Sequence, residues 1–401
     1  MPNASAISLE TRHPWRERTR VFVTACCAHA LHDGLTDALY VLLPTLQTVF
    51  GVDYAAIGVL RALYAGSMAG LQVPAGMLGR RVGPVGILAA GTALVGAGYL
   101  CLGAAGGLAT LALALVVGGI GSSTQHPIAS SLIAAAYEGR QSRDALGTYN
   151  FAGDLGKMAL PAGLACLLTV VSWRAAVVMV GGAALLGACA ILISLGGAQI
   201  ASAGPVAVGT QAGNKRAGAP RGGFNLLLAI GIIDSATRMS FLTFLPFLLK
   251  AKGAGTAEIG LALSLLFAGG AAGKLVCGFL GGRIGVLATV LITEGGTAAT
   301  IMALLPLPLH AALILLPLIG IALNGTSSVL YGTVPELVTP DRRETAFGVF
   351  YTATIGAGAL SPILYGYSGD VLGLTTTTIA TAIVVLLTLP LAWRLNPLLD
   401  A

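Results

Sequence analysis

Long apolar segments alternate with short polar turns along almost the whole chain. Each apolar segment is about twenty residues long, the length at which an α-helix crosses the hydrocarbon core of a bilayer, whereas barrel strands alternate over segments of about ten. The pattern predicts twelve helices, at residues 20–49, 55–78, 84–104, 107–135, 144–171, 173–197, 224–249, 256–280, 284–305, 308–335, 344–371 and 374–395. We therefore expect an all-α integral membrane protein.

Composition leads to the same class. Only 9% of the 401 residues are charged and 56% are hydrophobic, whereas soluble domains carry about 25% charged residues. These values exclude a water-soluble fold. The 56 glycines suit transmembrane helices whose backbones pack closely. The N-terminal segment contains Glu10 and Glu17 and no cleavage site after a short apolar core, so we expect a cytoplasmic tail and not a signal peptide.

The basic residues of the predicted loops gather on one side of the membrane. If the N-terminus is inside, the outside loops hold only Arg174, Lys250 and Lys252, and the remaining loop arginines and lysines are inside. Because cytoplasmic loops carry an excess of Lys and Arg, both termini are predicted to be cytoplasmic in the inner (plasma) membrane. These loops also account for the net charge of +6, so we expect no nucleic-acid partner.

The two halves of the chain repeat each other weakly but in register. "AAIG" at 55–58 returns as "AEIG" at 257–260, and "GMLGRRVG" at 76–83 returns as "GFLGGRIG" at 278–285, each 202 residues later. Parallel repeats of six helices place a substrate site between the halves near the bilayer midplane. The predicted units are an N-terminal tail (1–19), a six-helix bundle (20–197), a cytoplasmic linker (198–223), a second six-helix bundle (224–396) and a C-terminal tail (397–401).

These motifs resemble those of the major facilitator superfamily, in which two six-helix bundles are related by a pseudo-two-fold axis. More narrowly, "HALHDGLTDALYVLLP", "GSSTQHPIASSLIA" and "GTYNFAGDLGK" are similar to segments of the fosmidomycin-resistance group of efflux proteins. The resemblance implies export of a small molecule. The chain departs from the superfamily pattern at Arg80, where an Asp is usual, and Leu160 replaces the last Gly of a drug-antiporter signature.

Ionisable residues inside the predicted spans are the candidate functional groups. A charge at the centre of a membrane helix costs about 2.5–3.5 kcal/mol on insertion scales. The presence of several such charges therefore indicates a specific role for them. Counting depth along each helix places most of them near the midplane. We predict that cargo binding and proton coupling involve Asp33, Asp154, Lys157, Asp234, Arg238, Glu294 and Lys274.

Sequence spacing predicts which of these groups pair. Asp154 and Lys157 (i,i+3) and Asp234 and Arg238 (i,i+4) each share a helix face. Asp37 and Arg61 are expected to form an ion pair between the first two helices. For Asp37 and Arg61 a structural role and a functional role are equally open. For Asp33, Asp154 and Asp234 we favour a functional role, because they lie at the predicted depth of the site. The accessory candidates are His29, His32, Asp37, Arg61, His126 and Asn324, of which His126 either contacts cargo or only satisfies the kink at Pro127.

The leading prediction is a proton-coupled secondary transporter that moves a small polar or amphipathic molecule. Mixed charge in the cavity favours an anionic or zwitterionic cargo, and Asp33 is our candidate proton carrier. No nucleotide-binding motif occurs, so we expect neither ATP nor another cofactor, and we expect a monomer.

The sequence also contains features of two other functions. Transition-metal uptake is the alternative of the same fold, with Cys26, Cys27, His29 and His32 as ligands, although consecutive cysteines point to different helix faces. A membrane enzyme is disfavoured, because no serine or cysteine lies in a recognisable nucleophile motif.

Overall fold

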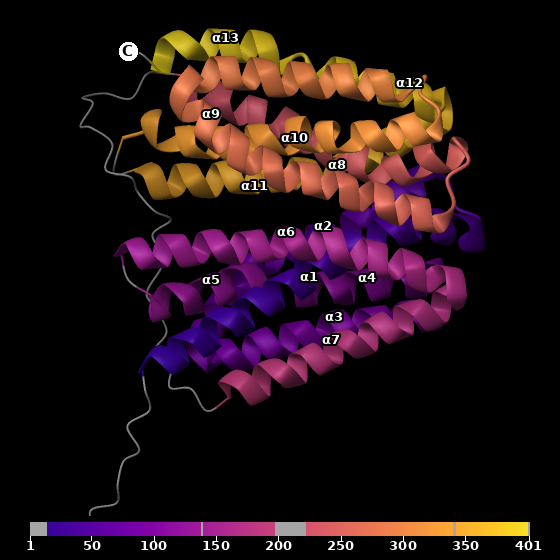
Figure 1. Cartoon of the computed structure of the whole chain (residues 1–401), viewed down its shortest axis with the longest axis vertical. Helices are drawn as coiled ribbons and strands as arrows, with labels where there is room; N and C mark the ends of the chain where they lie inside the picture. Colours follow the sequence, from indigo (N-terminus) through magenta and orange to yellow (C-terminus); the bar gives the residue numbers. More distant parts are fainter. Residues whose placement is uncertain (1–13, 138, 197–221, 340–341, 400–401) are drawn as a thin grey trace, which may run out of the picture.

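The computed structural model describes residues 14–137, 139–196, 222–339 and 342–399. Within these ranges the chain is helical apart from short connections (Figure 1). The helices are α1 (Pro14–Phe50), α2 (Tyr54–Val82), α3 (Pro84–Ala104), α4 (Leu108–Ser122), α5 (Gln125–Ala136), α6 (Gly139–Val170), α7 (Trp173–Leu195), α8 (Gly223–Ala251), α9 (Thr256–Leu304), α10 (Leu309–Thr333), the 3-10 helix η1 (Val334–Glu336), α11 (Arg343–Leu372), α12 (Leu374–Val385) and α13 (Thr388–Leu399). Residues 1–13 of the predicted N-terminal tail, 198–221 of the predicted linker and 400–401 lie outside the described ranges.

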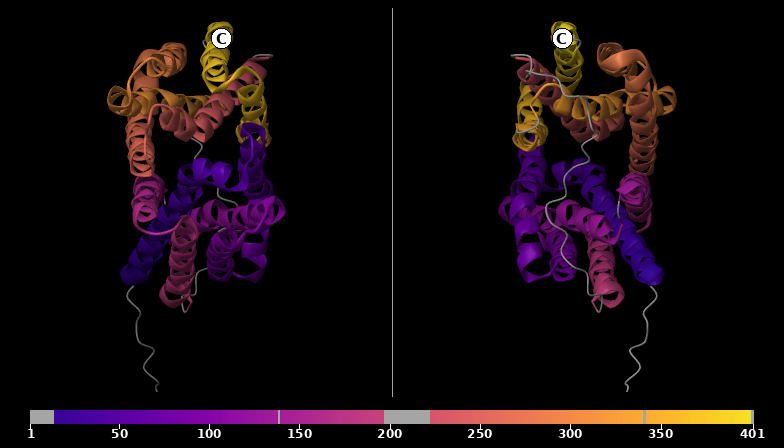
Figure 2. Two further views of the ribbon diagram at one scale, coloured as in Figure 1. Left: turned by 90° about the vertical axis from the view of Figure 1, so that its right-hand side faces the viewer. Right: turned by 90° about the vertical axis from the view of Figure 1, so that its left-hand side faces the viewer.

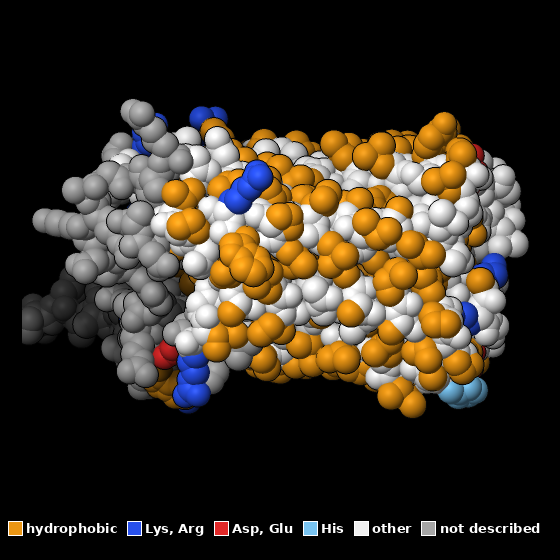
Figure 3. All heavy atoms as spheres, turned by 90° about the horizontal axis from the view of Figure 1, so that it is seen from above, with side chains coloured by type: hydrophobic (Ala, Val, Ile, Leu, Met, Phe, Trp, Pro, Cys, Tyr) orange, Lys and Arg blue, Asp and Glu red, His pale blue; other side chains and the backbone are white. Residues whose placement is uncertain are grey.

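The prediction of twelve membrane-crossing segments is confirmed. In the described part of the chain, eleven helical segments are long and apolar enough to cross a membrane. Helix α1 is the twelfth: it has 37 residues, but polar side chains such as His29, Asp33 and Asp37 lower its mean hydropathy. The surface view shows apolar side chains along the length of the molecule and basic ones towards its two ends (Figure 3).

The helices form two groups, α1–α7 and α8–α13, which lie against each other in all views (Figures 1 and 2). Helix α1 begins and α13 ends at the same end of the molecule, which we call the termini side; the opposite end is the far side (Figure 1). On the far side, one continuous core joins both groups, with Leu42 and Phe244 as members. On the termini side each group has its own core, one around Leu132 and the other around Leu330. Among the described residues, the apolar core that both groups share therefore lies on the far side.

Two predicted helices differ from the structure in their continuity. The predicted helix 107–135 is two helices, because α4 ends at Ser122 and α5 begins at Gln125. Pro127 explains the break: it has no N–H to donate to the carbonyl of Ser123, and it is tolerated in the first turn of a new helix. The last predicted helix, 374–395, is likewise divided into α12 and α13.

The backbone reproduces the 202-residue repeat. Gly51 and Gly253 have positive φ values of 62° and 90°, and Gly83 and Gly285 have values of 116° and 81°. Each pair is separated by 202 residues, and positive φ is a conformation that glycine adopts without a steric cost. Gly285 turns the chain between two spans that are otherwise continuous in α9. Corresponding turns in the two halves are therefore built by corresponding glycines.

Candidate functional site

A cavity of about 460 Å³ lies between the two groups of helices. Its walls come from α1, α2, α5, α8, α10 and α11, and its polar lining includes Arg61, Gln72, His126, Asp234, Arg238 and Tyr351. The parts of α2, α10 and α11 that line the cavity include their termini-side portions, for example at Gln72, Tyr331 and Tyr351. The volume is within the range of about 300–1,000 Å³ that is usual for small-molecule pockets.

The far side of the cavity is closed by direct backbone packing of α2 against α11. A Cβ atom at Gly58 would clash with the carbonyl oxygen of Pro362, and one at Gly366 would clash with that of Tyr54. The carboxylate of Asp370, at the end of α11, accepts hydrogen bonds from the backbone N–H groups of Tyr54 (2.9 Å) and Ala55 (2.8 Å). These contacts join the two groups at the start of α2.

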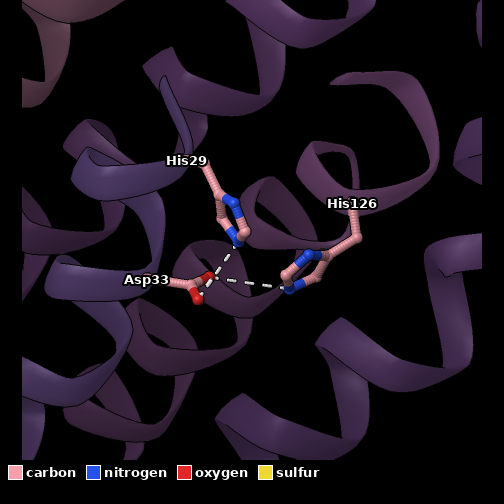
Figure 4. Close-up of side chains that lie close together, drawn as sticks. All are labelled: His29, Asp33 and His126. Carbon is pink, nitrogen blue, oxygen red and sulfur yellow. Dashed lines mark ion pairs between the residues drawn. The ribbon is translucent and has the colours of Figure 1, made fainter. Parts of the chain in front are cut away.

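Asp33 is the centre of a polar cluster in the first group (Figure 4). Its Oδ2 atom lies 3.2 Å from His29 Nε2 and 3.2 Å from Lys157 Nζ, and its Oδ1 atom lies 3.6 Å from His126 Nε2. His29 Nδ1 donates to the carbonyl oxygen of Tyr149 at 2.8 Å, which leaves Nε2 towards Asp33. His126 is the most accessible member of the cluster, and it also lines the cavity.

Asp154 pairs across the two groups and not with Lys157. Its Oδ1 atom accepts a hydrogen bond from Lys274 Nζ of α9 at 2.6 Å, whereas Lys157 contacts Asp33. The predicted i,i+3 pair is therefore wrong. The spacing places Asp154 and Lys157 on one face of α6, but the partners that the neighbouring helices offer decide the pairing.

The second group holds a cluster of two acids and one base. Asp234 Oδ2 lies 3.8 Å from Arg238 Nη2, as the i,i+4 spacing predicts. The carboxyl group of Glu294 on α9 lies beside that of Asp234, close enough for a hydrogen bond between the two. Glu294 is 1% exposed. Two carboxylates have no proton to donate, so a hydrogen bond between these groups requires a proton on one of them.

Arg61 does not form the predicted ion pair with Asp37. Its Nη2 atom donates to the hydroxyl of Tyr40 at 2.9 Å, and its guanidinium carbon lies 4.7 Å above the Tyr40 ring and 5.6 Å above the Tyr64 ring. An arginine that lies over aromatic faces is stabilised by cation–π attraction. Aromatic residues in an apolar segment are usually packing residues, so this partnership could not be predicted from residue type and spacing.

The remaining accessory residues have local partners. His32 is buried and its Nε2 atom lies 2.8 Å from Thr92 Oγ1. Asn324 donates to the carbonyl oxygen of Gly320 in its own helix. Cys26 and Cys27 are free thiols.

The four predicted metal ligands do not converge. In the described residues, the group that could hold a metal ion is instead His29, Asp33 and His126. Lys157 Nζ already contacts the same carboxylate at 3.2 Å, and this positive charge disfavours a cation there. The set Cys26, Cys27, His29 and His32 is therefore wrong as a metal site.

Comparison with known proteins identifies relatives over most of the chain. The family model described as Major Facilitator Superfamily matches residues 25–217 and 227–399. An "MFS-type efflux pump" of Mycolicibacterium smegmatis (strain ATCC 700084 / mc(2)155) is 26% identical over 275 residues, covering 65% of this chain and 63% of the relative, so the chain spans less than two thirds of that protein. A "Probable sulfoacetate transporter SauU" of Cupriavidus necator is 26% identical over 351 residues, covering 81% of each chain.

Solved structures share the fold. A bacterial homologue of the human lysosomal transporter Spinster, in an inward-facing and unoccupied conformation, superposes with a TM-score of 0.76 at 18% identity, over 95% of this chain and 97% of that chain. Its inward-facing and occupied form gives a TM-score of 0.75 at 18% identity, over 96% and 97% of the two chains. At this identity the likeness concerns the fold alone.

Proposed function

Because the chain belongs to the major facilitator superfamily, we propose that it is a proton-coupled secondary transporter that exports a small anionic or zwitterionic molecule by alternating access. The family and the relatives are transporters and not enzymes. We further propose that it acts as a monomer in the inner membrane, with both termini and the linker in the cytoplasm. The cavity then faces the cytoplasm in this structure.

The observation that carries this proposal is the Asp154–Lys274 ion pair. It is a contact between an acid and a base of opposite halves, at 2.6 Å. Any rocking of one half against the other changes the distance between them. A proton on Asp154 removes the attraction, so protonation and the relative position of the halves are coupled through this pair.

The second acid in the proposed proton coupling is Asp33, whose carboxylate lies 3.2 Å from Lys157 Nζ. When Asp33 is protonated, Lys157 loses this partner and its positive charge becomes available to an anionic cargo. Proton binding and cargo binding would thus be linked through a lysine. Buried charges of this kind are costly to keep in a membrane protein, which supports a role in transport.

The printed names of the relatives support the cargo class and the direction. One relative is a probable sulfoacetate transporter, which favours an organic anion. The other is an efflux pump. The similarity of the segments in α1, across α4 and α5, and in α6 to the fosmidomycin-resistance group also favours export. The metal-uptake alternative is not proposed, because its four ligands are apart and Lys157 contacts Asp33.

Proteoliposomes test this proposal. Sulfoacetate and a panel of other small carboxylates and sulfonates are offered under an imposed pH gradient, and uptake or release is followed with a pH-sensitive dye. We expect gradient-driven flux for the wild type and for Glu17→Gln, a control acid at the start of α1. Asp33→Asn and Asp154→Asn should lose gradient-driven flux and keep cargo exchange. If both variants still transport against a gradient, the proton role is wrong.

A further inference from the structure

The charged groups that line the cavity are unbalanced. Arg61 and Arg238 contribute two positive charges, and Asp234 contributes one negative charge. The cavity therefore carries a net positive charge before its histidine is considered. A cavity of this sign attracts anions and repels cations.

Arg238 is the less firmly held of the two arginines. The 3.8 Å between its Nη2 atom and Asp234 Oδ2 is longer than a hydrogen bond, and its Nε atom has no hydrogen-bond partner. A guanidinium has five N–H donors in a planar fork that matches carboxylate and phosphate geometry. Arg61 differs, because the Tyr40 hydroxyl and two aromatic rings hold it. Arg238 thus has unused donors beside a cavity.

The acid that faces Arg238 is itself controlled by a second acid. Glu294 is not part of the cavity lining, and it contacts Asp234 from α9. The groups that face this pair are Arg238 on α8, the Thr326 hydroxyl on α10 and, near Arg238, the Tyr351 phenol on α11. With one shared proton the pair carries one negative charge, and with two protons it carries none. The second proton therefore releases Arg238 from its only carboxylate neighbour at 4 Å or less among the described residues.

Resting on the proposed transport function, we propose that Arg238 binds the head group of a small organic monoanion and that a second proton on the Asp234–Glu294 pair makes it available. The head group is a carboxylate, sulfonate or phosphonate. Tyr331, Phe350 and Tyr351, which line the same cavity, provide a wall for an apolar or aromatic body. Their rings contact each other, with Tyr331 centroids 6.4 Å from Phe350 and 6.1 Å from Tyr351.

This arrangement makes proton binding and anion binding mutually favourable. A proton on the pair increases the affinity for the anion, and by thermodynamic linkage the anion increases the affinity for the proton by the same factor. The coupling needs no contact between cargo and Glu294, because Asp234 lies between Arg238 and Glu294 as the partner of both. Glu294 is thus a positioning residue that acts through Asp234.

Ligand-induced thermal stabilisation of the purified full chain in detergent tests the anion site. The probes are benzoate, benzenesulfonate and phenylphosphonate, with benzamide as the uncharged control. We expect the anions, and not benzamide, to stabilise the wild type, and more strongly at acidic than at neutral pH. Arg238→Gln should weaken anion binding about 10- to 100-fold, as expected for a lost charge-assisted hydrogen bond. Arg80→Gln, at the end of α2 outside the cavity, should leave binding unchanged.

Two further variants test the proton part. Asp234→Asn should bind anions with little dependence on pH. Glu294→Gln should remove the infrared C=O stretch of a protonated carboxyl group, a readout that needs no cargo. If Arg238→Gln does not fold, Arg238→Lys, which keeps the charge but loses the fork, should bind more weakly than the wild type.

Three outcomes would overturn the inference. They are equal stabilisation by benzamide, unchanged binding in the arginine variants, and no stabilisation by any anion at either pH. None of these depends on a gradient or on flux, because binding is measured on the purified chain in detergent. Failure of this site is therefore distinguishable from failure of the proposed proton-coupled flux.

Discussion

One carboxylate adds to the backbone packing that closes the far side. Asp370 of α11 satisfies two backbone N–H groups at the start of α2, those of Tyr54 and Ala55. When the far side opens, α2 and α11 separate and Asp370 leaves these donors. We therefore predict that Asp370→Ala shifts the protein from this conformation towards one that is open on the far side.

The size of the shift follows from the contacts. Helix-cap substitutions cost about 0.5–2 kcal/mol, and hydrogen bonds to charged groups contribute about 1.5–3 kcal/mol. Asp370 and its partners are exposed, so water replaces part of what is lost, and we take about 1–2 kcal/mol for the two bonds together. This corresponds to a change of about 5- to 30-fold in the ratio of the two conformations.

Double electron–electron resonance measures this ratio. Spin labels at Val49 and Leu372, which are exposed near the far-side ends of α1 and α11, report the opening as a longer distance. The labels are introduced after the six native cysteines have been replaced. We expect the long-distance population to increase in Asp370→Ala.

Asp53→Ala is the matched control. Asp53 caps the same helix through Ala56 N–H at 2.8 Å, but it lies in the same half as α2 and caps it in both conformations. It should weaken the helix start without changing the distance distribution. Our reasoning is refuted if Asp370→Ala leaves the distribution unchanged, or if Asp53→Ala changes it as much.

Two other predictions concern contacts between the halves. Asp154→Lys and Lys274→Asp should each lower the thermal stability by about 1–3 kcal/mol for this partly exposed pair, because each leaves an unpaired charge. The double exchange should recover much of this loss in a melting assay. If the double variant is no more stable than the single variants, the pair contributes nothing to stability. Gly58→Ala should impair far-side closure and flux, because the new Cβ atom would clash with the backbone of Pro362. Gly66→Ala should be neutral, because no atom lies within 4 Å of its Cβ position. Equal flux in the two variants would contradict the proposed close packing.

The membrane architecture could be predicted from the sequence because it depends on local properties. Segment length and hydropathy fix the spans, and the repeat gave the corresponding turns, which Gly83 and Gly285 confirm. A kink at Pro127 was predicted in the fourth span, but the division of that span into α4 and α5 was not. A proline interrupts the helical hydrogen bonds without interrupting the apolar pattern, so hydropathy alone predicts one continuous helix.

The candidate site could be predicted only where one helix carries both partners. The pair Asp234 and Arg238 follows from i,i+4 spacing. Lys274 reaches Asp154 from the other half, and Tyr40 receives Arg61 from a neighbouring helix. Such contacts depend on how helices cross and rotate, which residue spacing within one helix does not specify.

The single-residue corner at Gly285 has a consequence for biogenesis. The stretch α9 consists of two helices that meet at Gly285, whose backbone is not helical (φ 81°, ψ 169°). With so short a connection, neither span can cross the bilayer and wait for the other. The two must enter the membrane together as a hairpin.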